Sequence, residues 1–206
     1  MRPKSINKKT KRVLEKIASD DALLKKFYLA GGTALAIQLG HRESIDLDWF
    51  TKSDYSTAIL KKKLSRLGKF ELDSEEPGTV NGKLDGVKIS FFSYDYGLLF
   101  PLIDFCGVKL ADERDIAAMK IDAVSSRGSK KDFIDLYFLL KKYTLKKLLG
   151  FFERKYKNIK YNELHILKSL VYFEDAEAEP MPVMIRKAEW DTVKKTIERK
   201  VKMTIA

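Results

Sequence analysis

Cysteine is nearly absent from this chain of 206 residues, which contains Cys106 alone. A disulfide framework and a cysteine-based zinc site are therefore excluded, and Cys106 is expected to be a small core residue. No apolar run approaches the length of a membrane span, and the first residues lack the apolar segment of a signal peptide. We therefore expect a cytoplasmic protein with no membrane partner.

Acidic residues are outnumbered, since 40 Lys and Arg face 29 Asp and Glu and leave a formal net charge of +11. Such a surplus favours a polyanionic partner such as RNA or DNA, because binding displaces counterions from the nucleic acid. The alternative is a soluble surface that is basic without having such a partner. The hydrophobic content of 45% and the charged content of 33% indicate a globular protein that can build one good core.

The stretch 28–50 contains the first group of candidate site residues. It predicts a short apolar strand, a Gly31-Gly32 turn, a short helix and a second strand. A glycine pair between a strand and a helix lets backbone N–H groups approach a phosphate, and the helix N-terminus favours an anion. Thr33 is expected either to cap that helix or to donate its hydroxyl to a phosphate oxygen.

Two carboxylates follow on the second strand, at Asp46 and Asp48. Because they are two residues apart, they point to the same face of an extended strand, where they repel each other. Mg²⁺ (or Mn²⁺) is the natural compensating cation, since it is usually held by one or two carboxylates and by substrate phosphates. The alternative is a solvent-facing edge after an ordinary turn. The two pieces together predict a nucleoside triphosphate (NTP) at the glycines and its metal ions at the aspartates.

The remaining pattern predicts an α+β fold, with an α/β nucleotide-binding core at residues 1–108 and a helical region at 109–206. In the core, helices are expected at 10–26, broken near Asp20-Asp21, and at 55–67, with strands within 69–94 and at 102–105. Asp85-Gly86 gives a strong signal for a two-residue hairpin turn. The helical region predicts helices near 112–127, 130–143, 161–173 and 189–203, a strongly basic segment at 141–160 with an apolar buried side, and a proline-containing loop at 174–184.

A second group of charged residues, Lys120, Arg127, Asp132 and Asp135, lies in the helical region. The two cations are two turns apart on one helix face, and the two aspartates share a face of the next helix. A short connection would bring the cations close to the aspartates. One interpretation is an ion-pair network that locks the two helices together. The other is that Lys120 binds triphosphate oxygens while one of the aspartates orients it or assists catalysis.

These motifs carry a family resemblance. Gly-Gly-Thr followed by His-Arg-x-Ser-x-Asp-Leu-Asp-Trp-Phe resembles the first motif of the DNA polymerase β-like nucleotidyltransferases. Ala-Met-Lys, then Arg-Gly, then Lys-Asp-Phe-Ile-Asp-Leu-Tyr-Phe-Leu is similar to downstream motifs of the AbiEii/AbiGii-type toxin family. The resemblance covers roughly residues 25–200. It implies a polymerase-β-like core, a cognate antitoxin encoded beside the toxin and, for some relatives, transfer of nucleotides to the acceptor end of tRNA.

The expected function is therefore metal-dependent transfer of a nucleoside monophosphate from an NTP to an RNA, with tRNA as the expected acceptor. Basic residues at 141–160 are candidates for guiding the RNA backbone. The candidate catalytic residues are Asp46 and Asp48, which would bind the metal, with Lys120, Asp132 and Asp135. The candidate nucleotide-binding residues are Gly31, Gly32, Thr33, Arg42 and Arg127.

One departure from the superfamily pattern keeps two alternatives open. Polymerase-β-like sites usually place a third carboxylate on a later strand, and the corresponding strand here carries Lys88 and Ser90 instead. Asp85, Asp95 and Asp104 are the candidate substitutes. Without a third carboxylate, the chain could be a non-catalytic nucleotide- or RNA-binding protein. A transferase with a small-molecule acceptor is the other alternative, although a net charge of +11 disfavours a cationic acceptor such as an aminoglycoside.

Overall fold

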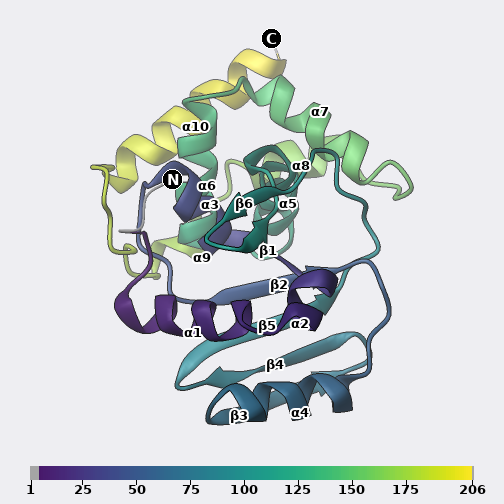
Figure 1. Ribbon diagram of the computed structural model, residues 1–206. Coiled ribbons are helices and arrows are strands. Elements are labelled where there is room, and N and C mark those ends of the chain that lie inside the picture. The colour runs from purple at the N-terminus through teal and green to yellow at the C-terminus, as the bar shows by residue number, and fades with distance from the viewer. Residues whose placement is uncertain (1–4, 206) are drawn as a thin grey trace.

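The computed structural model describes residues 5–205. Its centre is a seven-stranded mixed sheet in the order β3-β4-β5-β2-β1-β7-β6 (Figure 1). The strands are β1 (Tyr28–Ala30), β2 (Leu47–Thr51), β3 (Phe70–Glu76), β4 (Thr79–Leu84), β5 (Val87–Ser93), β6 (Ile103–Phe105) and β7 (Val108–Leu110).

Helices cover the sheet and build the second half of the chain. They are α1 (Lys8–Ala18), α2 (Asp21–Lys26), α3 (Gly31–Leu39), α4 (Thr57–Leu67), α5 (Glu113–Ser126), α6 (Lys130–Leu140), α7 (Leu145–Lys155), α8 (Glu163–Ser169), α9 (Glu174–Glu177) and α10 (Trp190–Ile205). In Figure 1, α1 and α4 lie along the strands at the bottom of the view, while α5 to α8 and α10 gather at the other end. Within residues 5–205, no helix is long and apolar enough to cross a membrane.

Strand β2 occupies the middle of the sheet, antiparallel to β1 and parallel to β5. Its apolar residues Leu47 and Trp49 are fully buried, so the strand is anchored on both sides of Asp48. In this register, Asp48 lies opposite Ala30 on β1 and opposite Ser90 on β5. The alternation of strand side chains therefore fixes the direction in which the Asp48 carboxylate points.

Two turns test local predictions. Asp85 and Gly86 both have positive φ, of 50° and 70°, which confirms the two-residue hairpin between β4 and β5. The prediction for Cys106 is wrong, because this residue is exposed in the turn between β6 and β7. Cys106 has a φ of 49° in this tight turn and lies outside the cluster of buried apolar side chains.

The helical half packs on the sheet side mainly through α3, which contacts both α5 and α6. One continuous cluster of buried apolar side chains runs from Val13 on α1 to Val201 on α10. The predicted α+β fold is confirmed. Strand β7 begins at Val108 and so crosses the predicted boundary between the core and the helical region, into which it leads. The expected loop at 174–184 begins with the short helix α9.

Candidate active site

Two cavities meet where β1 leads into α3 and β2 passes beside it. The first has a volume of about 300 Å³ and the second of about 330 Å³. Both are lined by Gly32, Asp48, Lys120 and Arg127. The first cavity adds mostly polar residues: Arg42, Glu43, Ser44, Ile45, Asp46, Lys131, Pro182 and Val183. The second adds mostly apolar and aromatic ones: Gly31, Phe50, Phe92, Ser93, Tyr94, Met119, Asp122, Ala123 and Tyr156.

The glycine pair is required by close packing at the start of α3. A Cβ atom on Gly31 would lie 2.7 Å from Oδ2 of Asp48, and Gly31 has a φ of 67°. A Cβ atom on Gly32 would lie 2.6 Å from Nη2 of Arg42. A Cβ atom at either position would displace the Asp48 carboxylate or the Arg42 guanidinium from the beginning of this helix, and the positive φ of Gly31 further favours glycine there.

Thr33 stabilises the segment that precedes β2 through hydrogen bonds of its side chain. The helix cap is Ala30, which offers no side-chain hydrogen bond, so the predicted capping role of Thr33 is wrong. The Thr33 hydroxyl is buried and bonds to the Ser44 hydroxyl at 2.8 Å and to the main-chain carbonyl of Asp46. It thus fixes the chain that enters β2 and positions Asp46 relative to Asp48.

The Asp46–Asp48 pair carries charge that its surroundings only partly offset. Burial, and secondly the Asp46 charge, raise the pKa of Asp48, while Lys120, Lys131 and Arg127 oppose this rise. Within residues 5–205, no group of three or more His, Cys, Asp or Glu could hold a metal ion. Two neighbouring carboxylates, of which Asp48 is disfavoured in its ionised form by burial and by the charge of Asp46, match the usual protein contribution to a Mg²⁺ site, which substrate phosphates complete. The residues present therefore fit a divalent cation.

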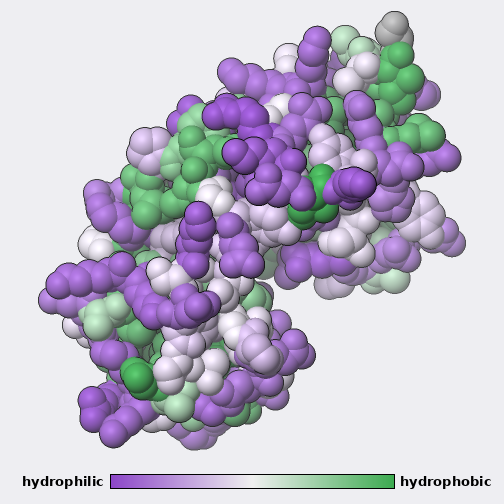
Figure 2. All heavy atoms as spheres, turned by 90° about the vertical axis from the view of Figure 1, so that its right-hand side faces the viewer, coloured by the Kyte–Doolittle hydropathy of each residue, from purple (hydrophilic) through white to green (hydrophobic). Residues whose placement is uncertain are grey.

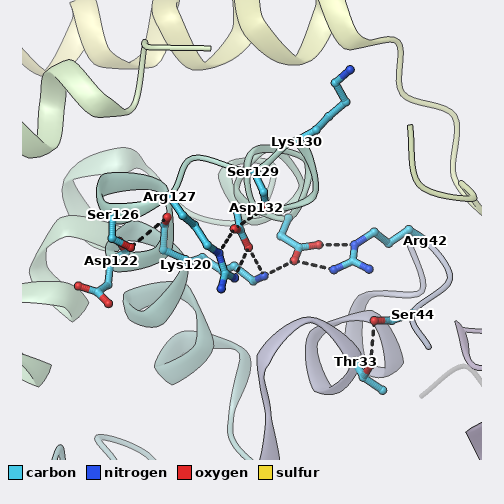
Figure 3. Close-up of polar contacts among 12 residues, drawn as sticks. Thr33, Arg42, Ser44, Lys120, Asp122, Ser126, Arg127, Ser129, Lys130 and Asp132 are labelled. Atoms are coloured by element: carbon cyan, nitrogen blue, oxygen red, sulfur yellow. Dashed lines mark hydrogen bonds and ion pairs between the residues drawn. The ribbon is translucent and has the colours of Figure 1, made fainter. Parts of the chain in front are cut away.

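Lys120 is the centre of a buried ion-pair network (Figure 3). Its ammonium contacts Oδ1 of Asp132 at 2.7 Å and Oδ2 of Asp135 at 2.6 Å. Asp132 also accepts hydrogen bonds from Arg127 at 2.9 Å and from the Ser129 hydroxyl at 2.6 Å. The cations lower the pKa of Asp132 to about 2 even though burial acts in the opposite direction.

Asp135 extends this network to the loop that follows α3. Its carboxylate accepts from Nε and Nη2 of Arg42 at 2.7 and 2.8 Å, and it bonds to Nε2 of His41 at 2.7 Å. Arg42 and Lys120 hold the pKa of Asp135 well below its usual range, against the effect of burial. Burial lowers the pKa of His41, whose Nδ1 lacks a hydrogen-bond partner in the described part of the chain. The ion-pair interpretation thus describes the contacts, while Lys120 still lines both cavities.

The predicted site residues divide into two sets. Seven line the cavities: Gly31, Gly32, Arg42, Asp46, Asp48, Lys120 and Arg127. Three lie behind them, with their side chains buried in hydrogen bonds: Thr33, Asp132 and Asp135. The second set can act only through the groups that it holds.

The candidate third carboxylates lie elsewhere, since none of Asp85, Asp95 and Asp104 lines either cavity. Ser90 is the β5 residue opposite Asp48, so the strand places a hydroxyl there. Asp85 pairs with Lys16 at 2.6 Å, and Asp104 pairs with Lys109 at 2.9 Å. An acidic side chain that the sequence interpretation missed, Asp122 on α5, lines the second cavity instead, where partial loss of solvent around the carboxylate raises its pKa.

Other lining residues were also missed. Pro182 and Val183 close the first cavity from the segment before α10, held there because the Glu43 N–H donates to the Val183 carbonyl at 2.8 Å. Tyr156, at the end of α7, reaches the second cavity, where its hydroxyl lies 2.7 Å from that of Tyr94. The proline pair predicted a loop, but no local signal tied these distant segments to the site.

Comparison with known proteins places this geometry in a family. A 39% identical relative, the uncharacterized protein aq_aa25 of Aquifex aeolicus (strain VF5), matches over 205 residues, which is 97% of each chain. Similar solved folds are JHP933 of Helicobacter pylori (TM-score 0.59, 15% identity, 97% of this chain and 93% of that one) and the nucleotidyltransferase toxin MenT4 of Mycobacterium tuberculosis (TM-score 0.58, 11% identity, 93% and 82%).

The family model described as the nucleotidyl transferase AbiEii toxin of type IV toxin–antitoxin systems matches residues 12–101 and 84–203. These two matches span nearly all of the described chain and include every candidate site residue. They confirm the resemblance that the motifs indicate. The chain therefore belongs to the AbiEii family of nucleotidyl transferase toxins.

Proposed function

We propose that this protein transfers a nucleoside monophosphate from an NTP to a hydroxyl of an RNA, with tRNA as the expected acceptor, in a reaction that needs Mg²⁺ or Mn²⁺. The observation that carries the proposal is that two cavities meet at Asp48 and Lys120. Direct transfer between two substrates requires two binding places that share the reacting position. A protein that only binds a nucleotide requires one.

The first cavity suits the triphosphate. Its wall contains the cationic groups of Arg42, Lys120, Arg127 and Lys131, together with Gly32 in the first turn of α3. Guanidinium and ammonium groups bind phosphate oxygens through charge-assisted hydrogen bonds, and the N-terminus of a helix adds a favourable dipole. The polyphosphate chain of an NTP therefore fits this cavity better than the more aromatic second cavity.

Asp46 and Asp48 would hold the divalent cation. A bound cation of this kind neutralises charge on the phosphates and so favours departure of pyrophosphate. The raised pKa of Asp48 supports this assignment, because burial and the Asp46 charge both disfavour the ionised carboxylate and a bound cation offsets both effects.

The transfer itself exchanges one bond for another. The acceptor hydroxyl oxygen bonds to the α-phosphorus, the bond from that phosphorus to the β-phosphate oxygen breaks, and pyrophosphate leaves. We assign the hydroxyl proton to Asp122, the carboxylate of the second cavity that does not hold the metal. Lys120 and Arg127 stabilise the charge that develops on pyrophosphate. Asp132 is a positioning residue, since it holds both of these cations.

Membership of the AbiEii family supports a role as a toxin that a cognate antitoxin restrains in the cytoplasm. We expect expression of the chain to stop growth and co-expression of the antitoxin to relieve the arrest. Expression of Asp48→Asn should leave growth unaffected. Growth arrest by this variant would separate toxicity from nucleotidyl transfer.

The proposal is tested by incubating the purified protein with total tRNA, Mg²⁺ and each α-labelled NTP in turn. Label on RNA with the intact protein, but not with Asp48→Asn, is the expected result and identifies the nucleotide. Metal-dependent pyrophosphate release without labelled RNA would indicate another acceptor. Nucleotide binding without any pyrophosphate release would contradict the proposal and favour a non-catalytic binding protein.

A further inference from the structure

A third cavity of about 400 Å³ lies beside the second. The two are joined by neighbouring residues on two segments: Tyr94 lines the second cavity and Asp95 the third, and Tyr156 lines the second while Lys155 lines the third. The loop after β5 and the end of α7 therefore line both cavities, and the ring centroids of Tyr96 in the third and Tyr156 in the second are 4.7 Å apart. We call the second and third cavities together the acceptor groove.

Aromatic rings form the wall of this groove. The ring centroids of Phe50 and Tyr94 are 5.4 Å apart, those of Tyr94 and Tyr96 are 4.9 Å apart, and those of Tyr96 and Tyr156 are 4.7 Å apart. Phe92, Tyr94 and Tyr96 are only half-buried, so part of each side chain remains open to solvent. Aromatic faces of this kind accept stacked nucleobases with little dependence on sequence.

Cations lie at the far end of the groove. Lys52, Arg154 and Lys157 line the third cavity and are exposed. Within residues 5–205, none of the three forms an ion pair with a carboxylate. Their charges are therefore available to an anionic ligand.

Lys155, the fourth cation of the third cavity, has a different role. Its ammonium is buried, pairs with Asp115 at 2.9 Å and donates to the Gly97 carbonyl at 3.1 Å. Asp115 also accepts the main-chain N–H groups of Leu99 and Phe100. This buried pair holds the loop that forms one side of the groove, so the shape of the groove exists before any ligand binds.

Figure 2 views the molecule from the side on which the connections after β2 and β5 run. Hydrophilic side chains cover most of this face, and an indentation separates a larger upper part from a smaller lower part. A polar, hollowed face suits a charged chain better than it suits an apolar protein partner.

We propose that the acceptor groove binds the single-stranded 3′ end of the acceptor RNA, with the terminal base stacked on Phe92 and Tyr94 and the preceding phosphates on the exposed cations of the third cavity. The inference rests on the proposed function and adds the place and form of its acceptor. An aromatic wall followed by cations is the combination that binds unpaired nucleotides. In a duplex the bases are already stacked and paired, so they cannot use the aromatic faces. The terminal hydroxyl then lies beside Asp48, where both cavities meet.

The test measures binding of a fluorescent single-stranded RNA of about eight nucleotides by anisotropy, without NTP. We expect the protein to bind this RNA more tightly than a duplex of the same length. A triple alanine variant of the groove cations should bind the single strand about tenfold or more weakly, and the salt dependence of its affinity should fall by about 2 in log–log slope. The substitutions are Lys52→Ala, Arg154→Ala and Lys157→Ala.

A matched control removes the same charge from another surface. The control substitutions Lys8→Ala, Arg12→Ala and Lys62→Ala affect exposed residues of α1 and α4. This variant should keep its RNA affinity within about twofold, because its cations lie outside the groove. Equal losses in the two triple variants, or no loss in the groove variant, would overturn the proposal, as would tighter binding of the duplex.

A third variant, Phe92→Leu, tests the base position while keeping the apolar bulk. It should weaken binding of the single strand about fivefold to tenfold and leave NTP affinity unchanged. A loss of NTP affinity with RNA affinity retained would assign the second cavity to the NTP base and overturn the proposal. Groove-dependent RNA binding without label transfer would leave this inference standing while the proposed function failed. Thermal unfolding of each variant confirms that it is folded.

Discussion

The molecule contains two aspartate pairs with opposite surroundings. Asp132 and Asp135 are fully buried and surrounded by cations, which lower the pKa of both carboxylates. Asp48, beside Asp46, lies at the meeting point of two cavities, and burial together with the Asp46 charge raises its pKa. Aspartate carboxylates are thus stabilised by neighbouring cations in one place and destabilised by burial and a neighbouring negative charge in the other.

This difference distinguishes carboxylates that position other side chains from carboxylates that are free to bind a ligand. A carboxylate that already has its cations gains little from a ligand, but it costs the protein much to lose. A carboxylate without enough cations costs little to neutralise and gains much from a metal ion. Asp132 and Asp135 therefore hold Lys120, Arg127 and Arg42, and we propose that Asp46 and Asp48 bind the metal.

The largest expected effect is the loss of stability on Asp135→Asn. This substitution leaves Arg42 and Lys120 buried beside a neutral amide, and breaking such a network costs about 3–5 kcal/mol. Urea unfolding measures the change in the free energy of unfolding. The control is Asp191→Asn, at an exposed position of α10, whose free energy of unfolding should stay within about 0.5 kcal/mol of that of the intact protein. Equal stabilities of the two variants would contradict the supporting role.

Asp48→Asn should show the reverse pattern. We expect label transfer to fall by about 100-fold or more, as when a charge-stabilising group is removed from an active site. The melting temperature should stay the same or rise, because the substitution relieves repulsion with Asp46. Asp104→Asn, which lies outside the three cavities, should retain activity. A large loss of stability in Asp48→Asn would indicate that this carboxylate is structural.

The supporting pair should also make the fold sensitive to acid. Because the folded state lowers the pKa of Asp132 from 3.8 to about 2, its stabilisation is present above pH 3.8 and is lost as pH falls toward 2. The loss amounts to about 2 kcal/mol from this group alone. The pKa of His41 is lowered from 6.5, so the unfolded chain takes up this proton first and stability begins to fall below about pH 6.5.

Urea unfolding as a function of pH measures this dependence. Asp132→Asn should flatten the profile between about pH 4 and pH 2, because it removes the carboxylate whose pKa differs between the two states. An unchanged slope in this variant would mean that other carboxylates account for the acid sensitivity.

The smallest expected effect is that of Arg127→Gln. The Arg127 side chain is 61% exposed, so removing its charge should cost about 1 kcal/mol of stability or less. It lines both cavities, so KM for the NTP should rise about tenfold through the loss of a charge-assisted hydrogen bond. An unchanged KM would confine Arg127 to the supporting network.

The sequence was most informative where structure is local. Apolar periodicity predicted most helices and strands, and Asp85-Gly86 predicted the hairpin turn, because both depend on neighbouring residues. The motif residues identified one wall of the site, since Gly31, Gly32 and Asp48 come from consecutive elements.

Long-range placement was not predictable in the same way. Val183 closes the first cavity, and Tyr156 joins the second, only because the helical half folds back on the sheet. The pairing of Ser90 with Asp48 depends on strand register, which sequence alone does not fix. The Asp135 carboxylate bonds to Arg42 and His41, which lie far from it in the sequence. The sequence alone therefore could not distinguish a catalytic role of Asp135 from a positioning role.

The most direct test of the central claim is the effect of Mg²⁺ and a non-hydrolysable NTP on thermal unfolding of the intact protein and of Asp48→Asn. A ligand that binds only the folded state raises the melting temperature by an amount that increases with the ratio of its concentration to its Kd. We predict that metal and nucleotide together stabilise the intact protein more than nucleotide alone, and that Asp48→Asn loses this metal-dependent gain while remaining folded. The same metal-dependent gain in both proteins would contradict the assignment of the metal to the Asp46–Asp48 pair.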